Sequence, residues 1–104
     1  MGVVYLMYDE GNGLCKIGVT RGSAENRLRT LQTGNSNKIS IVHVYQTDDP
    51  FKIESLLHNR FRMQHESGEW FALTYEDMAD FPQTCKWAQG IVDALRDNPF
   101  YNRG

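Results

Sequence analysis

No stretch of the sequence approaches the roughly 20 consecutive apolar residues that a membrane-crossing helix needs. The N-terminal region also lacks a basic segment followed by a long apolar one, which a secretory signal would contain. Gly2 could mark a myristoylation site, but Leu6 stands where that motif requires Ser or Thr. We therefore expect a cytoplasmic protein without a membrane partner.

Cysteine is scarce, since the 104 residues include only Cys15 and Cys85. Two cysteines this far apart match no metal-binding spacing and could form at most one disulfide. A fold held together by several disulfides is therefore excluded. Free thiols in a reducing cytoplasm are the favoured interpretation, because cytoplasmic proteins rarely keep disulfides.

The chain also lacks a strong charge of either sign, since 11 basic and 13 acidic residues give a net charge of −2. That balance argues mildly against a nucleic-acid partner. The distribution argues the other way, because residues 16–62 contain eight basic and four acidic residues. A locally basic face on an acidic protein can bind phosphates. Solvated surface charges that bind nothing would give the same count, so both interpretations stay open.

What the sequence does contain is the pattern of one domain with a modest core. Residues 2–8 are apolar on both alternations, and Gly11-Asn12-Gly13 leads into a second apolar run at 14–20. This predicts a β-hairpin whose first strand is covered on both faces. Residues 39–47 predict a third strand. The expected fold class is α/β (α+β), with a small three-stranded antiparallel sheet flanked by helices.

Three main helices are expected between and after these strands. Ser23 is a suitable N-cap for a helix to about residue 32. Asp49-Pro50 begins a second helix that should reach about residue 64, because proline suits the first helical position. Residues 65–68 read as polar loop and 70–73 as a short extended segment.

A last helix should begin near residue 82, with Trp87, Ile91 and Leu95 spaced as its buried stripe. We assign residues 1–74 to the main domain and residues 75–104 to a C-terminal helical extension packed on it.

Several polar residues depart from their local pattern. Arg27 lies about 60° from Ala24, at the edge of the buried stripe of the first helix, whereas Arg29 points well away. A half-buried guanidinium needs an anion, which could be a substrate phosphate or a structural partner such as Glu54 or Glu69. The helix phase alone favours the structural partner.

Two residues of the second helix form a comparable pair. Glu54 and His58 are four residues apart, so their side chains share one face of that helix. The plainer interpretation is a surface pair at the helix edge. The alternative is a histidine held by a carboxylate beside a phosphate site.

Three further residues each have a plain interpretation and a chemical one. Tyr5 in a core strand is most often packing, and Lys16 in a hairpin strand is most often solvent-facing. Glu69 is most often an exposed loop acid, but it could hold a metal, because magnesium is commonly bound by one or two carboxylates with water and substrate phosphate. None of the three is decisive alone.

Taken in order, these residues resemble the GIY-YIG nuclease superfamily, in its phage-associated branch of small domains. Val3-Val4-Tyr5 aligns with the first motif, without its glycine, and Lys16-Ile17-Gly18 aligns with the second. Lys16 replaces the second tyrosine of the name, as lysine does in some nuclease members. The resemblance extends from residue 2 to about residue 73.

The remaining motifs of the resemblance follow in the same order. Arg27 aligns with the helical arginine of the superfamily, and Glu54 and His58 match the helix pattern of the branch. Glu69, followed by Trp70-Phe71, matches its metal-binding glutamate. Each motif is weak alone, but the ordered set with these spacings is fairly specific.

The resemblance implies a metal-dependent endonuclease that hydrolyses phosphodiester bonds in DNA, in a bacterium or a phage-infected host cell. Tyr5 would act as general base toward water with help from Lys16, and Arg27 would stabilise charge on the phosphate. Glu69 would hold a single Mg²⁺ or Mn²⁺ ion, and His58 would orient a group or relay a proton.

Other exposed basic residues are candidates for DNA binding. They are Arg21, Arg29, Lys38, Arg60 and Arg62. Nothing after residue 73 resembles a sequence-reading module, so a homodimer or a partner protein would supply specificity, or specificity would be low. The alternative function is a catalytically inactive module that binds nucleic acid or a protein. A third possibility is an interaction domain whose polar groups satisfy one another.

Overall fold

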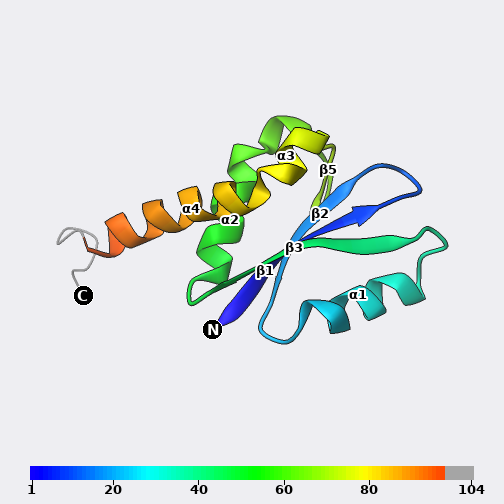
Figure 1. Cartoon of the computed structure of the whole chain (residues 1–104), viewed down its shortest axis with the longest axis horizontal. Coiled ribbons are helices and arrows are strands. Elements are labelled where there is room, and N and C mark those ends of the chain that lie inside the picture. The colour runs from blue at the N-terminus through cyan, green and yellow to red at the C-terminus, as the bar shows by residue number, and fades with distance from the viewer. Residues whose placement is uncertain (98–104) are drawn as a thin grey trace.

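A five-stranded antiparallel sheet forms the centre of the computed structural model, which describes residues 1–97 (Figure 1). Its strands, in chain order, are β1 (Gly2–Asp9), β2 (Cys15–Thr20), β3 (Ile39–Thr47), β4 (His65–Ser67) and β5 (Trp70–Phe71). Their order across the sheet is β3-β1-β2-β5-β4. The α+β class is confirmed, but the prediction of three strands is wrong. Residues 98–104 of the predicted extension lie outside the described part.

The two further strands form a short hairpin at one sheet edge. β5 falls within the extended segment predicted at residues 70–73, whereas the prediction of loop at residues 65–68 is wrong for β4. Trp70 pairs with Lys16, and Phe71 pairs with Cys15, so β5 extends the sheet beyond β2. Gly68, with a φ of 55°, makes the turn between β4 and β5. All three residues of β4 are exposed, so this strand shows no apolar alternation by which sequence could reveal it.

Helices cover both faces of the sheet. In Figure 1, α1 (Ala24–Thr33) lies on one side of it, and α2 (Pro50–Arg60) and α4 (Phe81–Arg96) lie together on the other. The short helix η1 (Arg62–Gln64) leads from α2 into β4, and the short helix α3 (Tyr75–Ala79) leads from β5 into α4. Ser23 caps α1 as predicted, accepting a hydrogen bond from the Asn26 backbone at 3.1 Å.

The first strand is buried on both faces, as its sequence predicts. Val4 and Leu6 enter one hydrophobic cluster with residues of β2, α2 and α4, including Ile53. Tyr5 and Met7 enter a second cluster beneath α1. Because successive side chains of a strand point to opposite faces, β1 serves both halves of the core.

The buried stripe of α4 differs from the predicted one. Its buried side chains include Phe81, Cys85, Ala88 and Val92. Trp87 is 43% exposed and Leu95 41% exposed, so the prediction of a Trp87–Ile91–Leu95 stripe is wrong. Both sets recur at helical spacing, and sequence periodicity alone does not say which one meets the sheet.

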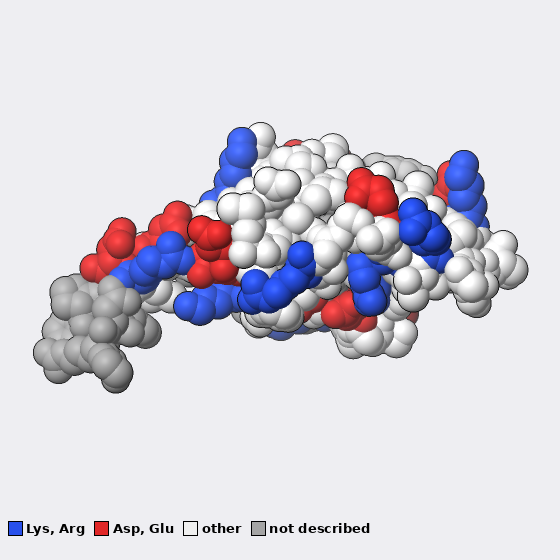
Figure 2. All heavy atoms as spheres, turned by 90° about the horizontal axis from the view of Figure 1, so that it is seen from below, with Lys and Arg blue, Asp and Glu red and all other residues white. Residues whose placement is uncertain are grey.

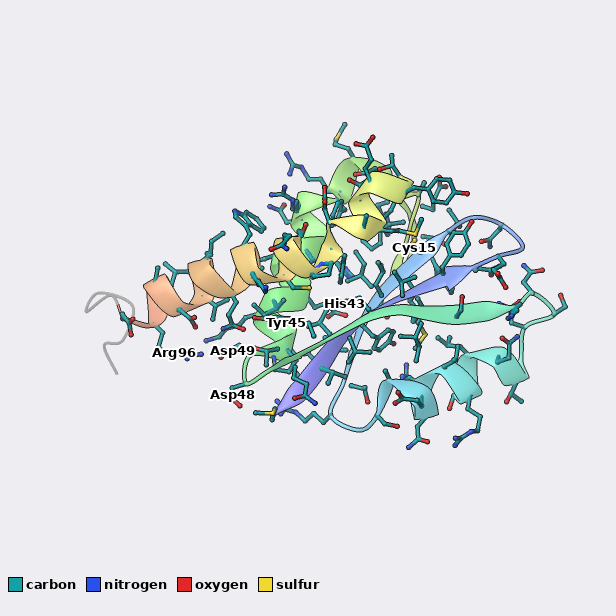
Figure 3. The ribbon with its side chains drawn as sticks, in the orientation of Figure 1. Cys15, His43, Tyr45, Asp48, Asp49 and Arg96 are labelled. Carbon is teal, nitrogen blue, oxygen red and sulfur yellow. The ribbon has the colours of Figure 1, made fainter. Side chains whose placement is uncertain are left out.

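Polar contacts fasten α4 to the rest of the domain. Arg96 pairs with Asp49 at the start of α2, as Figure 3 shows. Tyr45 and Thr47 of β3 both donate hydrogen bonds to the side-chain carbonyl of Gln89, at 3.2 and 2.6 Å. These contacts join α4 to β3 and to the start of α2.

The two cysteines are buried free thiols, which agrees with the prediction. Burial, followed by the charge of Asp77, raises the pKa of Cys15 to about 11, and burial raises the pKa of Cys85 to about 12. Both thiols are therefore protonated at neutral pH and chemically quiet. Within residues 1–97, none of the helices has the length and apolarity to span a membrane.

Candidate active site

The ring of Tyr5 lies against the backbone of Gly18. The two residues are opposite each other in the β1–β2 ladder, on the face that α1 covers. A Cβ atom on Gly18 would stand 2.9 Å from Tyr5 Cε1 and closer still to the hydroxyl. Glycine at this position therefore makes room for the phenol. Tyr5 is fully buried, and its hydroxyl finds no hydrogen-bond partner within the described chain.

Lys16 lies two residues before Gly18 on β2 and therefore on the same face as Tyr5. Its Nζ atom is 2.8 Å from Glu69 Oε1 and 5.7 Å from the centroid of the Trp70 ring. The Lys16 side chain is only 11% exposed. The interpretation of Lys16 as a solvent-facing strand residue is therefore wrong, because the lysine is buried against a carboxylate and an indole.

The backbone of Ile17 joins Glu69 and His58 at the point where β5 stops pairing with β2. The Ile17 N–H donates to the Glu69 carbonyl oxygen at 3.0 Å. The Ile17 carbonyl oxygen lies 2.9 Å from His58 Nε2. Since a carbonyl oxygen only accepts, Nε2 is the donor, and Nδ1 is the acceptor when the ring is neutral. His58 thus satisfies a strand-edge carbonyl that no neighbouring strand reaches.

Glu54, His58 and Glu69 bring donor atoms within 4.8 Å of one another. Glu54 Oε2 is 3.9 Å from His58 Nε2, one helical turn along α2, which agrees with the predicted pairing. The Glu54 side chain is 16% exposed, so the interpretation of this pair as a surface feature is wrong. Its Oε2 atom is buried and has no hydrogen-bond partner among residues 1–97. Such an oxygen is costly unless something binds it.

The two carboxyl groups of this cluster differ in acidity. Burial, followed by the charge of Glu69, raises the pKa of Glu54 to about 7. Burial would also raise the pKa of Glu69, but the hydrogen bond from Lys16 and its charge outweigh burial, so that pKa is lowered. The pKa values of two adjacent carboxyl groups move apart in this way, because the negative charge on one group makes ionisation of the other unfavourable. At neutral pH an ionised Glu69 therefore stands beside a Glu54 close to its midpoint.

The donor set suits a divalent cation. Glu69 offers a carboxylate, and Glu54 offers a buried oxygen that nothing else in the described residues satisfies. Carboxylate oxygens are the preferred ligands of Mg²⁺ and Mn²⁺. His58 Nε2 already contacts Ile17, so the two carboxylates rather than the imidazole are the primary donors. The residues present therefore fit the implied metal.

Arg27 is more exposed than its helix phase predicts. The stripe of α1 is as expected, with Ala24 buried and Leu28 half-buried against the sheet. Arg27 itself is exposed, and the described chain offers it no carboxylate within 4 Å. The expectations of a half-buried guanidinium and of a pair with Glu54 or Glu69 are therefore both wrong. Its neighbour Arg29 is also exposed and donates to Asn26 Oδ1 at 2.9 Å.

The remaining basic candidates do not gather in one place. Figure 2 shows Lys and Arg side chains distributed along one face of the molecule and interspersed with acidic ones. Arg21 lies 5.4 Å from the Phe51 ring, and Arg60 lies 4.5 Å from the Trp87 ring. Lys38 is 4.0 Å from Glu10, and Arg62 donates to the Asn59 carbonyl oxygen at 3.0 Å. All four are exposed.

Sequence reasoning did not predict two contributions to this cluster. Glu54 was expected to support His58, and its proximity to Glu69 depends on how the β4–β5 hairpin meets α2. That long-range contact leaves no local pattern in the sequence. The close approach of Gly18 to Tyr5 depends on the register of the β1–β2 ladder, which the predicted hairpin did not specify.

Comparison with known proteins identifies one family. The T5orf172 domain matches residues 2–86, which include both strands of the first hairpin, α2 and the β4–β5 hairpin. No curated protein and no solved structure matches the chain.

Proposed function

The chain belongs to the T5orf172 domain family, a phage-associated family of nuclease-related proteins, and from this premise we propose that it is a metal-dependent endonuclease acting on DNA. We further propose that it is a small GIY-YIG-type domain in which lysine replaces the second tyrosine. The observation that carries the proposal is the cluster of Lys16, Glu54, His58 and Glu69 around one point of β2. Tyr5 lies on the same face of the sheet as Lys16.

The residues of this cluster, together with Tyr5 and Arg27, have roles that fit phosphodiester hydrolysis. Tyr5 is the proposed general base for the attacking water, and Lys16 supplies positive charge on the same face of the sheet. Arg27, free of any described carboxylate, binds the phosphate and stabilises its developing charge. His58 positions the edge of β2 through the Ile17 carbonyl.

Glu69 and Glu54 are the residues that would hold a single Mg²⁺ or Mn²⁺ ion. When bound, such an ion stabilises negative charge on the phosphate and on the leaving oxygen. Glu69 is ionised and half-exposed, which suits first contact with a cation. Glu54 lies deeper and would complete the site by losing its proton.

One observation favours a second candidate, a catalytically inactive module that binds nucleic acid or a protein. The Tyr5 hydroxyl is fully buried, whereas a general base must reach the water from which it takes a proton. Catalysis therefore requires the cover over Tyr5 to open. A binding module has no such requirement.

Nicking of supercoiled plasmid separates the two candidates. The purified chain is incubated with plasmid DNA in Mg²⁺, in Mn²⁺ and in EDTA, with single-stranded RNA as a parallel substrate. We expect relaxed circles with either metal and none in EDTA. Glu69→Ala should abolish nicking, and the exposed Glu66→Ala, three residues away, should not. DNA binding without metal-dependent nicking would favour the inactive module.

A further inference from the structure

Lys16 and a divalent cation would compete for the same carboxylate. The Lys16 ammonium already contacts Glu69 Oε1 at 2.8 Å, and the lysine is buried at this position. A cation bound by Glu69 would therefore lie next to an ammonium group in surroundings partly shielded from water, where like charges repel strongly. Lys16 engages Oε1, so the two cations would compete for Glu69 through their mutual repulsion, each weakening the binding of the other.

A second group on the same face already lies close to the Lys16 ammonium. The indole of Trp70 lies 5.7 Å from Nζ, within the range in which an aromatic ring attracts a cation. Tyr5 is a diagonal neighbour of Lys16 across the β1–β2 ladder. An amine that leaves Glu69 would thus remain close to the proposed base and to the side on which the phosphate would bind.

We infer that Lys16 is an internal counter-cation, which holds Glu69 in the metal-free protein and is released when a divalent cation binds Glu69 and Glu54. The amine is then available to the phosphate only when the metal is in place. This inference rests on the proposed metal site. It assigns Lys16 a gating role in addition to its proposed part in catalysis.

The first experiment measures metal affinity without measuring cleavage. Binding of Mn²⁺ is followed by the electron paramagnetic resonance signal of free Mn²⁺, for the parent chain, Lys16→Met and Lys38→Met. Lys38 is the control, because its side chain is exposed and its ion pair is with Glu10, which is not part of the cluster. Removing a competing charge should tighten Mn²⁺ binding by about tenfold in Lys16→Met. Lys38→Met should bind as the parent does.

The second experiment uses the parent chain alone and so does not depend on how a variant folds. Lysine amines are labelled by brief reductive methylation with and without Mn²⁺, and each site is quantified by mass spectrometry. Labelling of Lys16 should increase severalfold with Mn²⁺, because the ammonium leaves its ion pair. Labelling of Lys38 and Lys52 should not change.

The outcomes separate this inference from the proposed function. If the parent binds Mn²⁺ and cleaves DNA but Lys16 labelling is unchanged, the gating role is wrong and the nuclease proposal stands. Equal or weaker Mn²⁺ binding by folded Lys16→Met would likewise overturn the gating role. A parent chain that binds no Mn²⁺ at millimolar concentration would remove the metal site and this inference together.

Discussion

The phenol ring of Tyr5 occupies the space that a side chain at position 18 would need. Gly18 lies opposite Tyr5 in the ladder, and an added Cβ would meet the ring at 2.9 Å or less. The backbone of Gly18 is ordinary strand, so the glycine is required by proximity and not by an unusual φ. Through this contact, the last residue of the Lys16-Ile17-Gly18 motif makes room for the proposed base, Tyr5.

Gly18→Ala should therefore damage both fold and function. Tyr5 is fully buried, so its ring can move away from a new methyl group only by disturbing the core under α1. Overpacking of this kind costs roughly 1–3 kcal/mol of unfolding free energy. The matched control is Gly90→Ala in α4, where nothing lies within 4 Å of the added Cβ. That variant should gain up to about 1 kcal/mol, because alanine favours helix. Urea unfolding measures both, and equal effects would refute the close approach.

Tyr5→Phe should separate stability from activity. The hydroxyl is buried without a described partner, so removing it should leave stability unchanged or raise it by about 1 kcal/mol. Loss of the proposed base should nevertheless abolish cleavage. Thermal unfolding and plasmid nicking are compared with those of Tyr75→Phe, an exposed tyrosine used as control. A Tyr5→Phe protein that cleaves at the parent rate would exclude Tyr5 as the base.

Glu54→Gln should stabilise the metal-free protein more at high pH than at low pH. A free glutamate has a pKa of about 4.3, whereas burial raises that of Glu54 to about 7. Below about pH 4.3 the Glu54 carboxyl group is protonated in both the folded and the unfolded chain, so it does not lower folding stability. Between these two values the unfolded chain ionises first, so folding stability falls as pH rises, and above about pH 7 the cost is constant.

The size of this effect is limited by the partial exposure of the site. We expect Glu54→Gln to gain about 1–2 kcal/mol more at pH 8 than at pH 4.5, measured in EDTA by urea unfolding. For a domain of this size, each kilocalorie corresponds to about 4–8 °C in Tm. Glu66→Gln, which removes an exposed charge, should show no such difference. Identical gains at both pH values would contradict a raised pKa for Glu54.

Substitution of the two arginines of α1, Arg27 and Arg29, should affect different steps: catalysis for Arg27 and DNA binding for Arg29. Arg27→Ala should raise the barrier by roughly 3–4 kcal/mol, by analogy with the loss of a preorganised donor to a developing negative charge. Arg29→Ala should weaken DNA binding in a salt-dependent way and leave turnover at saturating DNA nearly unchanged. Single-turnover cleavage at two salt concentrations measures both. Equal losses of turnover in the two variants would contradict a catalytic role for Arg27 that Arg29 lacks.

Much of this fold follows from local patterns in the sequence. The first hairpin, the third strand and the Ser23 cap each depend on residues close together in the chain, and each agrees with prediction. The capping box of Thr74 and Asp77 is equally local, because a capping box is a contact within one helical turn. The β4–β5 hairpin was not predicted as such, because the residues of β4 are exposed and polar and the strand that β5 pairs with lies about fifty-five residues earlier.

The candidate site was predictable as a set of residues but not as an arrangement. Glu54 and His58 follow from helical spacing, whereas the contact of Lys16 with Glu69 requires β5 to dock on β2. The exposure of Arg27 does not follow from its direction around α1. Sequence periodicity fixes the direction of a side chain around a helix, but it does not fix what lies beyond that side chain.

The proposed function depends above all on Glu69, which we propose holds a divalent cation that DNA cleavage requires. The most direct test titrates Mn²⁺ while measuring metal binding and single-turnover cleavage of the same DNA in the same samples, for the parent chain, Glu69→Gln and Glu66→Gln. We expect cleavage by the parent to rise with metal occupancy, Glu66→Gln to behave as the parent, and Glu69→Gln to lose both binding and cleavage. Undiminished cleavage by Glu69→Gln, or cleavage by the parent in EDTA, would contradict this expectation.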